Sequence, residues 1–253
     1  MKHVDMYGMP VFAPYKNGVR ISSELLNCAK ALQTNSTEDL ITHTGAGISV
    51  HDGDGKFTKY LKLSSESYKH KIENGQVSAA GKASFRSLNL TYLSDYNESL
   101  HQQFFLDQNG NKKAFLFLPE DKWQWRSDLP IEPFKQFVNN IGLDKIHLVR
   151  LIFLVPPAVG GIHIDASADS MKKYYAERNG VSLTFNLQSG DGRLFFRPKD
   201  DILQIDPALE AWHFNPSVPH AVGEVFNQRI QLRVFGSLDR NAYLERLDLE
   251  NSV

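Results

Sequence analysis

The chain has 253 residues, 42% of them hydrophobic and 23% charged, a composition typical of globular proteins rather than of disordered or membrane proteins. Its 28 Lys and Arg residues nearly balance its 29 Asp and Glu residues, which argues against a nucleic-acid or anionic-lipid partner and favours a small-molecule substrate. With one cysteine, Cys28, no secretory signal pattern and no apolar run of the roughly 20 residues that a membrane span needs, we expect a cytoplasmic protein without membrane contact.

The chain shows no internal repeat and no long linker, so we expect a single domain over residues 1–253. Residues 1–145 mix short helical and extended patterns. We expect this N-terminal part to pack on a strand-rich core over residues 146–240, which also carries the metal site described below.

Two amphipathic helices are predicted from apolar residues at helical spacing. The first covers residues 22–32, with Ser22 or Ser23 as its cap. The second covers residues 130–141, and we expect it to cover one face of the sheet that follows. A Gly- and Asp-rich stretch at 44–55 lacks the strand and helix that a phosphate-binding loop requires.

Short alternating runs separated by turn signals follow the second helix. They predict strands over residues 147–155, 161–165, 181–189, 193–197, 202–205, 212–215 and 229–236. So many short strands in succession are typical of an antiparallel sandwich or barrel.

Three side chains suited to a metal fall at strand ends. His163 and Asp165 share one side of a predicted strand, because residues i and i+2 point to the same face. His220 follows a turn-rich stretch at 215–219 that would hold it at the start of another strand. Two histidines and one carboxylate form the facial triad of non-haem Fe(II) sites, which leaves coordination positions open. A second His-x-Asp pattern, at His3, lies near the terminus and is expected to have no role.

Polar residues alternate with apolar ones along two predicted strands. The polar positions are Ser182, Thr184, Asn186, Arg229, Gln231 and Arg233. These faces would line the interior of a barrel; the alternative is that both meet solvent, as faces of antiparallel sheets often do. A 2-oxo diacid chelating the metal would need a cation a short distance away, ideally an arginine for bidentate pairing, and Arg229 follows His220 closely enough to supply it.

Residues 148–238 resemble the double-stranded β-helix core of 2-oxoglutarate and Fe(II)-dependent oxygenases, especially prolyl-hydroxylase-like and aspartyl/asparaginyl-hydroxylase-like members. The matching pieces are Val155-Pro156-Pro157 leading to His163-Ile164-Asp165, then Leu183-Thr184-Phe185-Asn186-Leu187 with its Gly190-Asp191-Gly192 turn, and Pro219-His220 followed by Arg229. The resemblance implies a mainly β fold with flanking helices around a jelly-roll or cupin-like core.

The resemblance further implies that His163, Asp165 and His220 bind Fe(II) as the catalytic centre. It implies 2-oxoglutarate and O2 as cosubstrates, and hydroxylation with release of succinate and CO2. Asp165 favours hydroxylation or desaturation over halogenation, because related halogenases have a small residue in place of the carboxylate ligand. Cupin metalloenzymes match the pattern less well, since their first motif usually supplies two histidines with a downstream Glu.

A cosubstrate pocket is implied as well. Arg229 is expected to bind the distal carboxylate of 2-oxoglutarate, with Arg233 as the reserve candidate. The family also places a hydroxyl beside that arginine, and Thr184 or Ser182 would supply it, depending on a strand register that the sequence does not set.

Substrate contacts are assigned to Arg150 and Asn186. Arg150 interrupts an otherwise apolar strand, and an inward-facing arginine needs an anionic partner. We hypothesise that this partner is a substrate carboxylate; an intramolecular salt bridge is the equal alternative. We expect the segment 166–180 to form a lid, because loops around a rigid barrel often set specificity.

Three further residues are expected to be structural. His213 is predicted to be a buried, hydrogen-bonded strand histidine rather than a metal ligand. Trp123 and Trp125 are predicted to serve the core rather than to stack on a substrate.

The predicted function is therefore an oxygenase acting on a free amino acid or another small metabolite. Two alternatives stay open. One is a protein or peptide side-chain hydroxylase of the same class. The other is a cupin-type protein without oxygenase activity, either a sensor or structural module that binds metal or ligand, or a metal-dependent isomerase or hydrolase that could use zinc.

Overall fold

A computed structural model describes the chain at residues 9–16, 20–36, 41–45, 83–93, 123–156, 158–163, 168–190, 194–196, 203–205, 209–218, 220–225 and 227–252. The helices are α1 (Ser23–Asn35), α4 (Glu132–Asn140), α5 (Ala168–Arg178) and α6 (Arg240–Glu245). The N-terminal strands are β1 (Phe12–Pro14), β2 (Ile41–Gly45), β3 (Ala83–Asn89), β4 (Thr91–Leu93) and β5 (Trp123–Trp125). The later strands are β6 (Lys145–Leu154), β7 (Ala158–His163), β8 (Gly180–Gln188), β9 (Leu194–Phe196), β10 (Leu203–Ile205), β11 (Ala211–Phe214), β12 (His220–Val225) and β13 (Arg229–Ser237).

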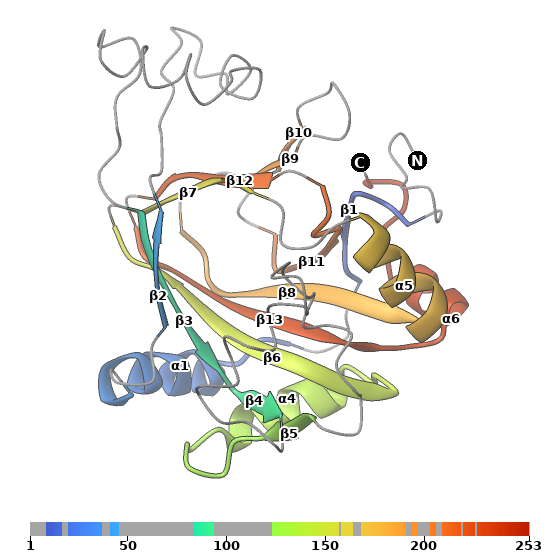
Figure 1. The fold of residues 1–253 in the computed structure, drawn as a ribbon. Helices are drawn as coiled ribbons and strands as arrows, with labels where there is room; N and C mark the ends of the chain where they lie inside the picture. The colour runs from blue at the N-terminus through green and yellow to red at the C-terminus, as the bar shows by residue number, and fades with distance from the viewer. Residues whose placement is uncertain are drawn as a thin grey trace, which may run out of the picture.

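Two antiparallel sheets form the centre of the molecule. The larger has the strand order β1-β11-β8-β13-β6-β3-β2, and the smaller has the order β10-β9-β12-β7. From β6 to β13 the chain passes back and forth between the two sheets, which lie face to face in Figure 1. This strand order is that of a double-stranded β-helix, or jelly roll, so the predicted fold class is confirmed.

The outer face of the large sheet carries the main hydrophobic core. Alternate residues of β6, β8 and β13 pack there against the buried faces of α1 and α4, which lie beneath this sheet in Figure 1. One such contact is edge-to-face, between Phe137 of α4 and Phe185 of β8, with ring centroids 5.1 Å apart. The second predicted helix therefore covers the sheet as expected.

Local sequence explains the start of α1. The Ser22 hydroxyl accepts a hydrogen bond from the Leu25 amide at 3.2 Å, which satisfies one of the backbone donors at the helix start. Leu25, Ala29 and Leu32 then fall on one buried face. The predicted helix and its predicted cap are confirmed.

The prediction of a lid over 166–180 is wrong for the part that the structure describes. Residues 168–178 form α5, and its Met171, Tyr174 and Tyr175 are buried in the main core. The Tyr174 hydroxyl donates to the Gly236 carbonyl at 2.7 Å, which ties the helix to β13. The segment is therefore a packed structural element.

Strand β5 pairs with β4 in a separate two-stranded antiparallel sheet. Its Trp123 and Trp125 are half-buried and pack against the main core. Their predicted core role is confirmed. None of the described helices is long and apolar enough to cross a membrane.

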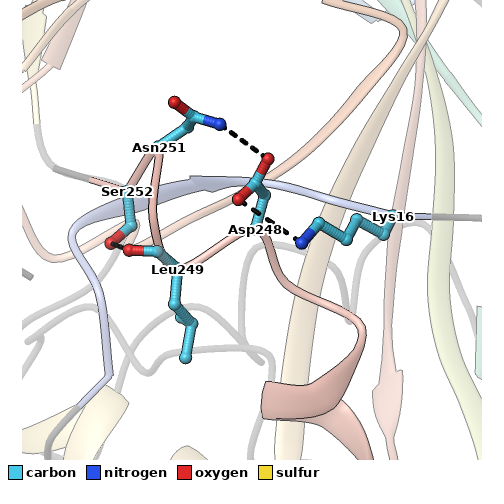
Figure 2. A network of polar contacts seen from close by, with 5 residues as sticks. All are labelled: Lys16, Asp248, Leu249, Asn251 and Ser252. Carbon is cyan, nitrogen blue, oxygen red and sulfur yellow. Dashed lines mark hydrogen bonds and ion pairs between the residues drawn. The ribbon is translucent and has the colours of Figure 1, made fainter.

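The first and last described segments hold each other at one edge of the large sheet. The Asp248 amide donates to the Pro14 carbonyl at 2.8 Å, beside the bridge between Tyr15 and Leu247. Figure 2 shows the Asp248 carboxylate between the Lys16 ammonium, at 3.5 Å, and the Asn251 amide, at 2.8 Å. The hydrogen bond from Asn251, with the nearby Lys16 charge, lowers the pKa of Asp248.

Candidate metal and cosubstrate site

The strand register of the small sheet brings two of the predicted metal ligands together. His220, the first residue of β12, lies directly opposite His163, the last residue of β7. On its other side His220 pairs with Phe196 of β9. Residues directly opposite in an antiparallel pair have Cβ atoms about 5 Å apart on the same face. This register is what a metal shared by two strands requires.

The third predicted ligand, Asp165, lies outside the described residues, and for His163 the structure describes the backbone alone. Within the part of the chain that is described, no three metal-ligating side chains gather in one place. Of the predicted triad, the structure therefore describes two things: the backbone pairing of His163 with His220, and the side chain of His220.

The His220 ring is oriented by its neighbours. The side chain is buried, and Nδ1 lies 2.9 Å from the Val218 carbonyl oxygen. A carbonyl can only accept, so Nδ1 carries the hydrogen and the neutral ring has its lone pair on Nε2. Metal-binding histidines commonly use one ring nitrogen for the metal and donate a hydrogen bond from the N–H of the other to a carbonyl in this way. His220 is thus in the tautomer that could ligate a metal through Nε2.

A tight turn fixes the carbonyl that orients His220. The Asn215 side-chain oxygen accepts from the Ser217 amide at 2.9 Å and from its hydroxyl at 2.7 Å, and the Val218 amide donates to the Asn215 carbonyl at 3.1 Å. These bonds form an Asx-type turn immediately before β12. The prediction that this stretch holds His220 at a strand start is confirmed.

The sequence did not point to Phe214, which contacts His220 from the large sheet. The two rings meet edge-to-face with centroids 5.3 Å apart. Phe214 alternates with His213 on β11 and faces the small sheet, where it packs in a cluster with Leu194 and Ile205. That alternation was the available signal.

The polar faces of β8 and β13 point between the two sheets. Apolar partners on the same strands, such as Leu183 and Leu232, lie in the outer core with the helices. The polar residues Ser182, Thr184, Asn186, Arg229 and Gln231 are all buried, and Arg233 is half-buried. The alternative that these faces meet solvent is therefore wrong, and the predicted interior lining is confirmed.

Arg229 is fully buried at the start of β13. It pairs with Leu154 of β6, whose apolar side chain belongs to a small cluster between the sheets with Ile152 and Val225. Burying a guanidinium costs several kcal/mol unless it meets an anion or good acceptors. Gly190 packs against it so closely that an added Cβ would lie 2.9 Å from the Arg229 Cβ. The chain thus places an arginine, fully buried, between the two sheets.

The register also places the predicted hydroxyls. Thr184 lies opposite Arg233, and Ser182 lies opposite Phe235. Arg233 is roughly 13 Å further along the strand than Arg229, at the usual rise of a strand. The structure therefore brings Thr184 beside the reserve arginine and not beside Arg229.

The two residues predicted to contact substrate both lie between the sheets. Arg150 pairs with Arg233 across β6 and β13, and its Nε donates to the Asn89 side-chain oxygen at 2.7 Å. Asn186 accepts from Gln231 Nε2 at 3.1 Å and donates to the Leu209 carbonyl at 2.7 Å. Arg150 is thus anchored by Nε, while the Asn186 amide already joins β8 to β13 and to the loop before β11.

His213 has the structural role predicted for it. Its Nε2 donates to the Pro10 carbonyl at 3.1 Å, and its Nδ1 lies 2.7 Å from the Tyr243 hydroxyl. The side chain is fully buried, and burial lowers its pKa to about 4. Both ring nitrogens are engaged by the protein, which leaves no role as a ligand.

No protein-family model matches the chain, and no curated protein matches it. The solved structures that resemble it include a Pseudomonas putida prolyl-4-hydroxylase, with 13% identity and a TM-score of 0.32 over 85% of this chain and 99% of the other. A 2OG-Fe(II) oxygenase family protein from Burkholderia pseudomallei has 11% identity and a TM-score of 0.35, over 87% of this chain and 96% of the other.

A prolyl hydroxylase from Trichoplax adhaerens, solved with a peptide fragment of the hypoxia inducible factor oxygen degradation domain, has 11% identity and a TM-score of 0.35 over 87% of this chain and 92% of its own. These structures come from the family that the sequence resembles. Because the TM-scores are low, the fold class rests on the strand order of the two sheets, and the function is argued from the residues of the site.

Proposed function

We propose that the chain is a 2-oxoglutarate- and Fe(II)-dependent oxygenase that hydroxylates a free amino acid or another small metabolite. The observation that carries this proposal is the pairing of His220 with His163, with His220 in the tautomer that presents Nε2 to a metal. A fully buried arginine between the same two sheets, Arg229, supports the choice of a diacid cosubstrate.

His163, Asp165 and His220 would hold the iron as two histidines and one carboxylate. The donor set suits Fe(II), because it combines imidazole and carboxylate ligands and leaves open positions. When bound, Fe(II) with 2-oxoglutarate and O2 supplies the oxidation of a C–H bond to an alcohol, with release of succinate and CO2.

The chain itself orients and shields. Val218 fixes the His220 tautomer, and Phe214 packs on the ring. In the proposal Arg229, which is fully buried, pairs with the distal carboxylate of 2-oxoglutarate through its guanidinium group. Apolar residues around it, such as Leu154 and Val225, keep water away from that pair.

The test is an anaerobic titration of the Fe(II)-loaded protein with 2-oxoglutarate, followed by the visible metal-to-ligand charge-transfer band. Wild type should develop the band. Arg229→Gln should bind 2-oxoglutarate at least roughly 30-fold more weakly, because a buried charge partner is lost. Its Fe(II) affinity should change little. Asp165→Ala and His220→Gln should lose Fe(II) affinity by more than the roughly 10- to 100-fold typical of an outer-shell change.

Two controls make the result specific. Arg20→Gln changes an exposed arginine outside the site, and His213→Gln changes a buried strand histidine that is not a proposed ligand. Both should keep the band. Arg229→Lys retains the charge and separates loss of the cation from loss of folding, which near-UV circular dichroism monitors in every variant.

The contrary outcomes are distinct. If Arg229→Gln binds 2-oxoglutarate as tightly as wild type does, Arg229 is not the partner of the distal carboxylate. The assignment of the metal ligands would be unaffected. Absence of the band in wild type, with Fe(II) demonstrably bound, would favour a cupin-type protein without oxygenase activity.

A further inference from the structure

The His220 ring is held by the stretch of chain that directly precedes it. Its Nδ1 donates to the Val218 carbonyl at 2.9 Å, and the ring meets Phe214 edge-to-face with centroids 5.3 Å apart. The Val218 side chain packs in the same cluster as Phe214. Two contacts of the imidazole therefore depend on how residues 214–218 are folded.

Asn215 sets the fold of this stretch. Its side-chain oxygen accepts from the Ser217 amide at 2.9 Å and from the Ser217 hydroxyl at 2.7 Å. Its backbone carbonyl accepts from the Val218 amide at 3.1 Å, and the residue is only 1% exposed. Because one buried side chain closes the turn, the position of the Val218 carbonyl depends on Asn215, and so does the direction of the His220 ring.

The turn is attached at its base to the first described segment. The Asn215 amide donates to the Val11 carbonyl at 2.9 Å, directly before β1. Nε2 of His213 donates to the preceding carbonyl, that of Pro10, at 3.1 Å. The end of β11 is thus bonded to two successive carbonyls, and a shift of the turn would break these bonds.

We propose that Asn215 is a positioning residue for the metal, because it places the Val218 carbonyl that orients Nε2 of His220. The inference rests on the proposed function and adds a residue outside the proposed ligand set. Loss of the partner of the second ring nitrogen typically lowers the metal affinity of a histidine site roughly 10- to 100-fold. Here that partner is a backbone carbonyl, which no substitution of Val218 removes. The side chain that places the carbonyl is therefore the one to change.

The arrangement also couples the metal to the turn. A metal that requires one orientation of His220 stabilises the turn that gives this orientation, since coupling between two sites is reciprocal. Metal binding should therefore slow hydrogen exchange at the amides of Asn215, Ser217 and Val218, the three donors that hold the turn.

The test uses the full-length protein under anaerobic conditions, with Fe(II) for calorimetry and Co(II) as a spectroscopic probe. Asn215→Ala should bind Fe(II) roughly 10-fold more weakly than wild type. Ser217→Ala removes one of the two bonds to the Asn215 side chain and should bind Fe(II) about 3-fold more weakly. The visible bands of bound Co(II) report ligand geometry and should change in Asn215→Ala. Ser217→Thr keeps both donors and should match wild type.

Asp239→Ala is the matched control. The Asp239 carboxylate accepts from the Asn241 and Ala242 amides at 3.0 and 3.1 Å, so this variant loses a side-chain cap of the same kind, at the start of α6. Its melting temperature should fall, as that of Asn215→Ala should. Its Fe(II) affinity and Co(II) bands should stay at wild-type values, and metal binding to wild type should leave exchange of the Ala242 amide unchanged.

The outcomes separate this inference from the proposed function. Wild-type Fe(II) affinity in Asn215→Ala and Ser217→Ala would overturn the inference alone, as would amides of the turn that exchange equally fast with and without metal. Absence of the 2-oxoglutarate band from wild type, with weaker metal binding in both variants, would overturn the proposed function and support the inference.

Two remaining results are also decisive. If Asn215→Ala does not fold, Ser217→Ala decides: weaker Fe(II) binding that Ser217→Thr restores supports the inference, and wild-type binding overturns it. A wild-type protein that binds neither Fe(II) nor Co(II) would overturn both the inference and the proposed function.

Discussion

His213 and His220 are close in sequence and differ in what their rings can do. His213 lies on β11 of the large sheet with both ring nitrogens bonded to protein groups, Tyr243 and Pro10. His220 begins β12 of the small sheet and donates Nδ1–H to a carbonyl, which leaves the lone pair on Nε2. The difference between a structural histidine and a candidate ligand lies in the groups around each ring.

The depressed pKa of His213 predicts acid sensitivity. The unfolded chain takes up a proton at this residue near pH 6.5, whereas the folded chain takes it up only near pH 4. Keeping His213 neutral therefore stabilises the fold fully above pH 6.5. This stabilisation, about 3 kcal/mol in the free energy of unfolding, is lost as the pH falls toward 4. Urea unfolding at pH 7 and pH 4.5 should show a smaller loss in His213→Gln than in wild type. An equal loss in both would show that other groups set the acid limit.

At the scale of elements, β13 is positioned by a close approach from the end of β8. A Cβ at Gly190 would lie 2.7 Å from the Asn227 carbonyl oxygen and 2.9 Å from the Arg229 Cβ. Backbone atoms and the first side-chain carbon cannot move aside as the tip of a flexible side chain can. The segment that carries Arg229 is thus held in place by the absence of a side chain at Gly190.

Gly190→Ala should therefore shift the start of β13. We expect a loss of about 1–3 kcal/mol in the free energy of unfolding, as for other overpacked sites. Because Arg229 moves with the backbone, 2-oxoglutarate affinity should fall in the same variant. Ser189→Ala changes the exposed neighbour and should affect neither quantity. Unchanged stability and affinity in Gly190→Ala would show that the backbone relaxes without consequence.

The alternation of apolar and polar residues made the strands between 145 and 237 largely predictable, because the strands of the large sheet each turn one apolar face toward the outer core. Strand β12 was anticipated only at its first residue, His220. Residues 166–180 were expected to form a lid because loops around a rigid barrel often set specificity, yet residues 168–178 form α5, in which Met171, Tyr174 and Tyr175 are buried. The burial of these three residues comes from tertiary packing that local pattern does not reveal.

Strand register was the part of the site that local sequence could not supply. The chain pairs Thr184 with Arg233, and a shift between Ile230 and Gln231 separates this pairing from the start of β13. Such irregularities depend on contacts between distant segments. The polar face of each strand was predictable from the alternation of residue types, whereas the pairing between the strands required the fold.

At the scale of the whole molecule, the N-terminal part completes the core sheet. Strand β3 pairs with β6, and β1 pairs with β11, so both flanks of the β6–β13 unit are covered by earlier segments. Helices α1 and α4 cover the outer face, as Figure 1 shows. Without them a large apolar face and two sheet edges would meet water.

This arrangement leads to a test of the single domain that the sequence predicts. We expect calorimetry of the full chain to give a single cooperative transition, with equal calorimetric and van't Hoff enthalpies. Residues 146–253 alone should lack near-UV circular dichroism and the dispersed amide spectrum of a folded protein. A well-dispersed spectrum from that fragment would instead establish the β-helix core as an independent domain.

The position of β12 between β7 and β9 has a consequence for biosynthesis. During translation His163 leaves the ribosome long before His220, and every strand from β8 to β11 lies between them in the chain. On the proposed ligand set, a nascent chain can offer the metal only part of its coordination sphere. On that ligand set, the complete coordination sphere forms only once β12 has paired with β7.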